Sequence, residues 1–326
     1  MKHISVLLTQ GNSSLSNLEA SYKMFNMAND FSLQNGKEPI FKVNLVAAKK
    51  EIKKSNTIFA ITPDATFEDI QKTDLIIIPA THGNYQQVVN DNQEAIPWLI
   101  KNYEQGAEIA SLCIGAFILA STGLLDGKHC ATHWLAAQEF RQMYPRVKLV
   151  DDRIITYENG IYTSGGAYSS LNLNLYLLEK YAGREMAILS SKVFEIDIER
   201  ESQAPFIIFH GQKNHDDDDV RKAQSYLETN YTSSITINEV CNLVGVGRRS
   251  FERRFKKATN NTIIEYFQRV KIEAAKKELE KGSKTINEVM FEVNYNDPKT
   301  FRELFKRFTG ITPNAYRNKF AKQISA

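Results

Sequence analysis

A cysteine stands where a buried strand is expected to turn directly into a helix. The segment 111–117 reads SLCIGAF, in which Cys113 follows an apolar run and Gly115 relieves the crowding at the turn. This order is typical of a nucleophile elbow, which places one side chain at a sharp strand-to-helix turn. A helix N-terminus beside Cys113 favours its thiolate, and His133 is a candidate base. An ordinary hydrogen-bonded core histidine is the alternative for His133, whose support is its spacing from Cys113.

A second group of chemically active residues is basic and occurs twice. The segment 236–240 (TINEV) returns at 285–289, and 250–257 (SFERRFKK) is echoed at 300–307 (TFRELFKR). A repeat of about 50 residues indicates a repeated structural element. Each copy predicts a short apolar helix, a tight turn and a basic helix, which is the layout of a DNA-reading helix-turn-helix.

The residues at the start of each copy fix where its first helix begins. Thr236 with Glu239, and Thr285 with Glu288, form the pattern of a capping box. The basic helices are then expected at about 249–258 and 298–308. Between the copies, 262–281 predicts one helix of about 19 residues, which is ~28 Å long. That length is close to the ~34 Å between successive major-groove faces of B-DNA, so the two copies are expected to occupy adjacent turns of one duplex.

Phenylalanines four residues apart in each basic helix are expected to face the core. The opposite face then carries the candidate DNA-binding residues, which are Arg248, Arg249, Glu252, Arg253, Asn296, Lys299, Arg302 and Lys306. Arginine reads guanine through a bidentate fork, and Asn296 could pair with adenine in the same way. Charges that merely solvate a helix are the alternative, and two basic helices in register with two capping boxes argue against it.

The net charge of +3 is spread unevenly along the chain. Residues 220–326 hold 21 Lys and Arg against 11 Asp and Glu, whereas residues 1–219 hold 20 against 27. A basic third joined to an acidic two-thirds indicates a nucleic-acid module attached to another domain. We predict an α/β domain over 1–210, an acidic linker over 211–219 and a DNA-binding domain over 220–326. The four aspartates at 216–219 could bind a metal, but a solvated linker with charges at a helix N-terminus is favoured.

The composition excludes several other classes of protein. A chain of 326 residues can form two domains with separate cores, and no run approaches the ~20 apolar residues of a membrane span. The N-terminus lacks the pattern of a signal peptide. Cys113, Cys130 and Cys241 are too scattered for a disulfide framework or a zinc site. We therefore expect a cytoplasmic protein with no cofactor and no metal.

The acidic two-thirds has the pattern of an open α/β sheet. The short apolar runs at 75–79 and 109–112 are typical of parallel strands buried on both faces, and an amphipathic helix is expected between them at 94–103. The order of strand and helix predicts right-handed crossovers.

The basic third resembles the AraC/XylS family of transcription regulators over about 225–322. The closing segment 308–317 (FTGITPNAYR) is among the most specific parts of the match. The resemblance implies an all-α domain of seven helices with two helix-turn-helix motifs. It also implies double-stranded DNA as the partner, read by the first basic helix and often by the second.

Residues 3–205 resemble the PfpI/ThiJ superfamily, which is class I glutamine amidotransferase-like, in the branch fused to AraC-type domains. The resemblance runs through Cys113, the turn at 124–127 (LLDG), 132–134 (THW) and 163–166 (TSGG). It implies a flavodoxin-like sandwich, a homodimer, and a pocket at the elbow. We expect Cys113, His133, Ile114 and Thr81 to line that pocket and to receive an unknown small-molecule effector.

Two departures from the superfamily pattern bear on catalysis. The loop 11–17 (GNSSLSN) has no carboxylate until Glu19, and Ala80 and Thr81 stand where many members have two glycines that supply oxyanion-hole amides. A nucleophile without these groups loses much of the electrostatic stabilisation on which such catalysis depends. We therefore expect no catalytic residue and a ligand-sensing or dimerising domain. The alternative is a cysteine-dependent hydrolase, amidase or glyoxalase-like enzyme with an accessory DNA-binding domain.

Overall fold

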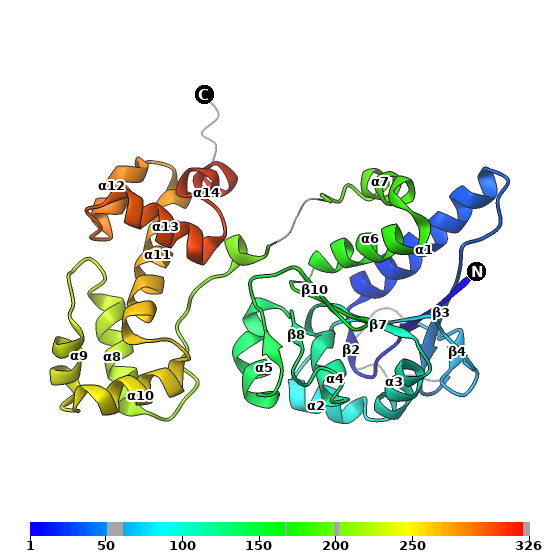
Figure 1. Cartoon of the computed structure of the whole chain (residues 1–326), viewed down its shortest axis with the longest axis horizontal. Coiled ribbons are helices and arrows are strands. Elements are labelled where there is room, and N and C mark those ends of the chain that lie inside the picture. Colours follow the sequence, from blue (N-terminus) through cyan, green and yellow to red (C-terminus); the bar gives the residue numbers. More distant parts are fainter. Residues whose placement is uncertain (51–60, 167, 199–201, 322–326) are drawn as a thin grey trace. The chain divides into compact units, whose positions relative to one another are not determined.

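The computed structural model describes residues 1–50, 61–166, 168–198 and 202–321. They form two compact units, Met1–Gln203 and Ala204–Ala326. Figure 1 shows a sheet between helices in the first unit and a set of helices in the second. Within the described residues, no helix is both long enough and apolar enough to cross a membrane.

A seven-stranded sheet forms the centre of the first unit, in the order β10-β11-β7-β5-β1-β3-β4. Its strands are β1 (Lys2–Leu7), β3 (Phe41–Ala47), β4 (Ala65–Thr66), β5 (Leu75–Ile78), β7 (Glu108–Ser111), β10 (Ile155–Glu158) and β11 (Ile161–Ser164). All neighbours run parallel except β10 with β11. Two short pairs lie outside this sheet, β2 (Asn12–Ser13) with β6 (Thr81–His82) and β8 (His129–Cys130) with β9 (Lys148–Leu149).

Helices cover both faces of the sheet (Figure 1). One face packs against α1 (Leu15–Gln34), α6 (Ser169–Ala182) and α7 (Arg184–Val193), and the other against α2 (Tyr85–Asp91), α3 (Ala95–Glu104), α4 (Ala116–Ser121) and α5 (Ala137–Met143). Successive side chains of a strand point to opposite faces. In β5, Leu75 and Ile77 accordingly join the α1 side of the core, while Ile76 and Ile78 join the α4 side.

The second unit is helical after the short 3-10 turn Ala204–Phe206. Its helices are α8 (Asp218–Thr229), α9 (Ile237–Val244), α10 (Arg248–Thr259), α11 (Ile263–Lys281), α12 (Ile286–Glu292), α13 (Pro298–Thr309) and α14 (Pro313–Phe320). Two apolar clusters lie along it, and α11 contributes to both, through Ile263 and Val270 to the first and Leu279 to the second. The predicted fold class, a flavodoxin-like α/β sandwich followed by an all-α domain with two helix-turn-helix motifs, is confirmed.

Of the two roles predicted for the acidic segment before α8, the charges at a helix N-terminus are confirmed, because Asp217 caps α8 and Asp218 and Asp219 lie in its first turn. The two units divide between Gln203 and Ala204, earlier than the expected boundary at 210. The residues that follow belong to the helical unit, because Phe209 packs against its first apolar cluster and Asp217 caps α8. Four like charges in a row suggested solvation, but the sequence does not reveal the cations that pair with them.

Candidate functional site

Both copies of the helix-turn-helix are present, and their first helices begin at the predicted capping boxes. In each copy the threonine hydroxyl accepts the backbone N–H of the glutamate three residues on, and that glutamate accepts the backbone N–H of the threonine. Reciprocal caps of this kind satisfy two N–H groups that a helix end leaves unpaired. Thr236 and Thr285 therefore fix the start of α9 and of α12.

The turn of each copy contains a residue in the left-handed region. Gly245 has φ 67° after α9, and Asn294 has φ 58° after α12. Glycine adopts this conformation without steric cost, and asparagine is among the side chains that tolerate it best. Asp297 then accepts the N–H of Thr300 at 2.7 Å, and Pro298 occupies the first turn of α13. Local sequence thus sets both turns that present the basic helices.

One face of each basic helix is buried and the other is open to solvent. Phe251, Phe255, Phe301 and Phe305 are at most 1% exposed, as the four-residue spacing predicts. The opposite faces carry the eight candidate DNA-binding residues. Arg248, Arg249, Arg253, Asn296, Lys299, Arg302 and Lys306 are exposed, and Glu252 is half-buried. Contact of these side chains with DNA remains a prediction.

Most of the candidate DNA-binding cations on these two faces form no ion pair with another described residue. Arg248 Nε lies 3.1 Å from Glu252 Oε1, one turn further along α10. In the part of the chain that the structure describes, no ion pair involves Arg249, Arg253 or Arg302, nor Lys299 and Lys306 in α13. Exposed guanidinium and ammonium groups without partners are available to phosphate and to base edges.

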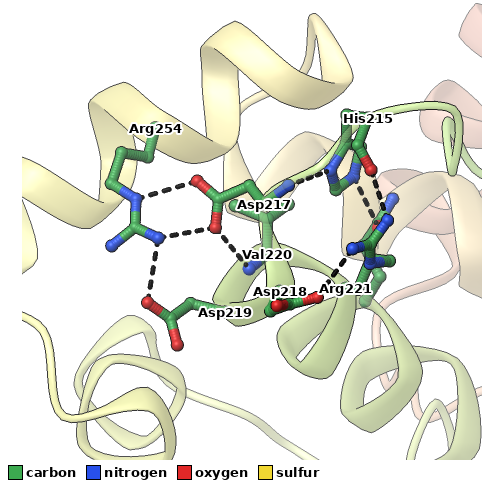
Figure 2. A network of polar contacts seen from close by, with 8 residues as sticks. His215, Asp217, Asp218, Asp219, Val220, Arg221 and Arg254 are labelled. Atoms are coloured by element: carbon green, nitrogen blue, oxygen red, sulfur yellow. Dashed lines mark hydrogen bonds and ion pairs between the residues drawn. The ribbon is translucent and has the colours of Figure 1, made fainter.

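Arg254 also belongs to α10, but its guanidinium is directed at the acidic segment and binds it (Figure 2). Its Nε and Nη2 lie 2.8 and 2.6 Å from the two carboxylate oxygens of Asp217, and Nη2 lies 2.8 Å from Asp219. The hydrogen bonds from Arg254 hold the pKa of Asp217 below its usual value. The aspartates thus serve as cap and ion pairs, and the described residues contain no cluster of three or more His, Cys, Asp or Glu that could hold a metal.

The elbow in the α/β unit has the predicted backbone geometry. Cys113 has φ 55°, one of few residues other than glycine in the left-handed region, and α4 follows after a single 3-10 turn. A Cβ atom at Gly115 would lie 2.7 Å from the carbonyl oxygens of Ile78 and Pro79. Since no side chain fits at that distance, Gly115 is what allows the turn to pass so close to the end of β5.

The thiol of Cys113 does not have the reactivity that the sequence suggested. Its side chain is buried, with Cys113 2% exposed, and burial raises the pKa of the thiol to about 12 although it accepts the N–H of Ile114. Helix N-termini favour thiolate where solvent also reaches the sulfur. Here desolvation outweighs that effect, so the expectation of a thiolate at Cys113 is corrected.

His133 lies near the elbow but is not placed as a base for Cys113. The Thr132 hydroxyl donates to the Cys113 carbonyl oxygen at 3.0 Å, which fixes the neighbouring backbone. His133 Nδ1 accepts the N–H of Leu135 at 3.1 Å, so the neutral ring carries its proton on Nε2. Burial, with His82 nearby, lowers the pKa of His133. Among the described residues, no hydrogen bond joins this ring to Cys113.

Three backbone amides around the elbow already have acceptors inside the fold. The N–H of Ala80 donates to Asn17 Oδ1 at 3.1 Å, that of Cys113 to Ser164 Oγ at 3.3 Å, and that of Gly115 to the Leu112 carbonyl oxygen at 2.9 Å. An oxyanion hole requires donors aimed at the reacting atom and free to bind it. These three N–H groups already bind other acceptors, so they are not free to bind a reacting atom.

Buried hydroxyls occupy the space between the first loop and the elbow. Thr9 Oγ1 lies 2.6 Å from Thr81 Oγ1 and also bonds Ser13 Oγ, and all three side chains are buried. The strand β6, which contains Thr81, contacts the turn that contains Cys113 and Ile114. The structure thus brings together the backbone around Cys113, Ile114 and Thr81, with hydroxyl groups beside them.

Comparison with protein families agrees with this architecture. The model of the DJ-1/PfpI family matches residues 15–180, and that of a helix-turn-helix domain matches residues 240–319. The first match runs from α1 into α6 and includes every strand of the seven-stranded sheet except β1, and the second covers both basic helices.

Three known proteins illustrate the similarity. The HTH-type transcriptional regulator GbdR of Pseudomonas aeruginosa is 25% identical over 258 residues, which are 79% of this chain and 69% of that protein. Isonitrile hydratase of Pseudomonas putida is 25% identical over 154 residues, which are 47% of this chain and 63% of that one. The structure of a ThiJ/PfpI family protein from Pseudomonas syringae superposes with a TM-score of 0.50 at 17% identity, covering 75% of this chain and 90% of that one. Because the family match over 15–180 spans half of the chain and includes the elbow and six of the seven strands of the sheet, this chain belongs to the DJ-1/PfpI family and carries a C-terminal helix-turn-helix domain.

Proposed function

We propose that this chain is a sequence-specific DNA-binding regulator of transcription whose α/β unit senses a small molecule. The observation that carries the proposal is the pair of basic faces on α10 and α13, where Arg249, Arg253 and Arg302 are exposed and form no ion pair in the described structure. The regulators among its relatives, such as GbdR, support the same function. A target on DNA also supports a cytoplasmic location.

Within the basic helices, some residues are suited to read bases and others to contact phosphate. Arg249 and Arg253 lie in the first half of α10, where a recognition helix meets base edges in the major groove. Lys299 and Arg302 have the equivalent place in α13. Lys256 lies in the last turn of α10 and is suited to phosphate. The 19 residues of α11 set the distance between the two helices, about 28 Å along the axis.

A segment that begins at Gln203 is suited to connect the elbow region with the DNA reader. Gln203 Nε2 donates to the Thr132 carbonyl oxygen at 3.0 Å, and its Oε1 accepts the N–H of Gly166 at 3.0 Å. A Cβ at Gly165 would lie 2.5 Å from the Gln203 side chain, so the glycine makes room for it. Gln203 therefore contacts the same loop, 132–133, that borders Cys113.

The residues directly after Gln203 are fixed to the helical unit. The turn Ala204–Phe206 contacts α13, the N–H of Phe209 donates to Glu273 at 3.1 Å, and Lys276 donates to the Ile207 carbonyl oxygen. A ligand bounded by Cys113, Ile114, Thr81 and His133 that displaces Gln203 would disturb a segment seated on α11 and α13. A ligand shifts DNA binding only if it prefers one of two states, and this segment supplies an element through which it can do so.

We also propose that the protein acts as a homodimer. Tyr157 and Tyr176 are 52% and 45% exposed, and both rings contact Tyr162, at 4.6 and 5.9 Å between centroids. Tyr157 belongs to β10, the antiparallel strand at one edge of the sheet. An exposed aromatic cluster beside a sheet edge is typical of a surface that a second chain covers.

A second candidate function is catalysis at the elbow, because one relative is an isonitrile hydratase. The protonated, buried thiol of Cys113 and the committed amides of Ala80 and Cys113 weigh against it. An assay of the purified chain with isonitriles, amides and 2-oxoaldehydes separates the two candidates, since sensing predicts no turnover.

DNA binding is tested with the full chain and its own upstream region. Several lysine and arginine contacts to phosphate should make log K fall by ~0.9 for each phosphate contacted per unit of log salt concentration. We expect salt-dependent binding that favours one site in this region over random duplex by fluorescence anisotropy. Equal affinity for both duplexes at every salt concentration would refute sequence-specific regulation.

Sensing is tested in cells with two changes at the elbow. Cys113→Ser keeps a small polar side chain and should leave the response of the native promoter unchanged. Cys113→Trp fills the space of a ligand and should abolish the response while DNA affinity of the purified protein persists. A response lost with Cys113→Ser alone would instead indicate chemistry at the thiol.

A further inference from the structure

Two lysines of α11 are almost fully buried, and they differ in how their charge is balanced. Lys271 is 6% exposed and Lys276 is 4% exposed. Lys276 Nζ lies 2.7 Å from Glu273 and also donates to a backbone carbonyl. Within the described residues, Lys271 Nζ has one acceptor, the Ser233 carbonyl oxygen at 3.2 Å, and no carboxylate partner. Buried charges are normally paired, so Lys271 departs from the rule that Lys276 follows.

The other groups around the Lys271 ammonium are aromatic. Nζ lies 4.8 Å from the centre of the Phe267 ring and 5.4 Å from that of Tyr295. Cation–π contacts offset part of the cost of desolvation, but they leave donors of the ammonium without acceptors, since lysine has three. Burial lowers the pKa of Lys271, which is the expected response of an ammonium that lacks a counter-charge.

Lys271 lines a cavity of about 260 Å³ inside the helical unit. Its walls are mainly apolar and include Ile235, Ile237, Ile264, Phe267 and Tyr295. Ile264 is 54% exposed, so the cavity is open to solvent at this side chain. Its volume is below the ~300 Å³ at the lower end of drug-sized pockets. It therefore suits a small ligand with an apolar body.

We propose that this cavity binds a small aliphatic carboxylic acid, with the carboxylate on the Lys271 ammonium and the chain along Ile237 and Ile264. A carboxylate supplies both the missing acceptors and the missing charge. Among the lining residues Lys271 is the one cation, which matches a monoanion better than a phosphate with its larger charge. The apolar wall then favours an alkyl body over a polar one.

The cavity lies where the two helix-turn-helix copies meet. Ile237 belongs to α9 of the first copy, and Tyr295 belongs to the turn of the second. Asn294, in that same turn, donates to the Ser234 hydroxyl at 3.0 Å. A ligand here touches elements of both copies, and its site is separate from the elbow in the α/β unit. Binding at this site does not depend on the proposed sensing role of Cys113.

The test is titration of the full chain with octanoate near pH 7, followed by calorimetry. We expect saturable binding, with affinity rising up to about fourfold per methylene from butanoate to octanoate. Octanol, which has the chain without the charge, should bind at least about tenfold more weakly, as should octanoate to Lys271→Met, because a charge-assisted hydrogen bond is lost. Lys277→Met removes an exposed lysine of the same helix and should change nothing.

A second pair of variants keeps the test decisive if Lys271→Met fails to fold. Ile264 is exposed, so Ile264→Glu should fold and should weaken octanoate by repulsion, whereas the neutral Ile264→Gln should retain more of the binding. Absence of saturable binding to the wild-type chain at millimolar octanoate would overturn the proposal. Equal binding of octanol and octanoate, or equal effects of the two Ile264 variants, would overturn it as well.

Discussion

At the elbow three backbone amides are satisfied by the protein itself, whereas on the basic helices several cations are left for a partner. The N–H groups of Ala80, Cys113 and Gly115 each have an acceptor in the fold, and the Cys113 thiol is buried and protonated. On α10 and α13, by contrast, Arg249, Arg253 and Arg302 are exposed and form no ion pair within the described residues.

This difference bears on the two motifs that the sequence singled out, the elbow and the pair of basic helices. A reactive elbow needs a thiolate and free amides, because catalysis depends on donors that wait for the transition state. A DNA-reading helix needs the opposite, namely cations whose interactions remain unsatisfied until DNA arrives. The α/β unit has the backbone shape of a nucleophile elbow with a buried thiol of raised pKa, which supports our proposal that it senses a ligand, while the helical unit presents both the shape and the charge of a DNA reader.

The largest effect that would break this comparison concerns the reactivity of Cys113. A rise of the thiol pKa from 9.0 to about 12 lowers its thiolate fraction about a thousandfold near neutral pH. We therefore expect Cys113 to resist iodoacetamide in the native protein at pH 7.5, as followed by mass spectrometry of its peptide. The same peptide should react at the ordinary rate of a free thiol once the chain is unfolded in urea. Rapid native alkylation of Cys113 would restore the enzymatic interpretation.

Much of the fold follows from local patterns, and for that reason it was predictable. The capping boxes at Thr236 and Thr285, the buried phenylalanines and the apolar strands at 75–79 and 109–112 depend on neighbours within a few residues. The position of Gly115 at the turn is local in the same way, because the strand and helix that meet there are adjacent in sequence, whereas the carbonyl oxygens that exclude a side chain there belong to the distant Ile78 and Pro79. Propensity, capping and periodicity act over this range.

The parts that sequence reasoning missed depend on partners far apart in the chain. Arg254 binds Asp217, 37 residues away, so the aspartate run resembled a solvated linker. The pKa of Cys113 depends on burial, to which segments on both sides of the elbow contribute. The backbone N–H of Ala80 donates to Asn17, 63 residues away, and no pattern in the neighbouring sequence predicts that hydrogen bond. Electrostatic environment is set by packing, which no short window of sequence contains.

The next effect in size separates base reading from charge on the helical unit. Arg249→Ala or Arg253→Ala should cost ~1–3 kcal/mol of binding to the specific site and relax preference at one or two base pairs. Lys256→Ala is the matched control, since loss of a phosphate contact should weaken all duplexes about equally and reduce the salt slope by about one unit. Competition anisotropy with single-base variants of the site measures both. If the arginine variants weaken specific and random DNA alike, these residues only position the helix.

The smallest predicted effect concerns Asp217, whose charge the helical unit uses internally. Asp217 accepts hydrogen bonds from Arg254 and caps α8 through the N–H of Val220, and those from Arg254 contribute most to the lowering of its pKa. A carboxyl whose pKa is lower in the folded state stabilises that state above its unfolded pKa near 4, and this contribution is lost as pH falls through the folded value.

Asp217→Ala should cost ~1 kcal/mol through the lost cap alone, and more at pH 7 because the pair with Arg254 is lost too. Asp217→Asn keeps a capping side chain, so it should cost less than the alanine variant.

The two Asp217 variants can be told apart from general charge effects by pH. Urea unfolding monitored by circular dichroism at pH 7 and pH 3.5 should show the asparagine variant approaching the wild type at the lower pH, because below pH ~4 the unfolded chain takes up a proton at Asp217 and part of the stabilisation by the lowered pKa is lost. Asp216→Asn removes a neighbouring exposed carboxylate. Its difference from wild type in the free energy of unfolding should be about the same at both pH values. A constant difference between Asp217→Asn and wild type at both pH values would mean that the ion pair with Arg254 adds nothing to stability. In that case the acidic segment would serve α8 as a cap alone, and Arg254 would be free to join the cations that α10 presents to DNA.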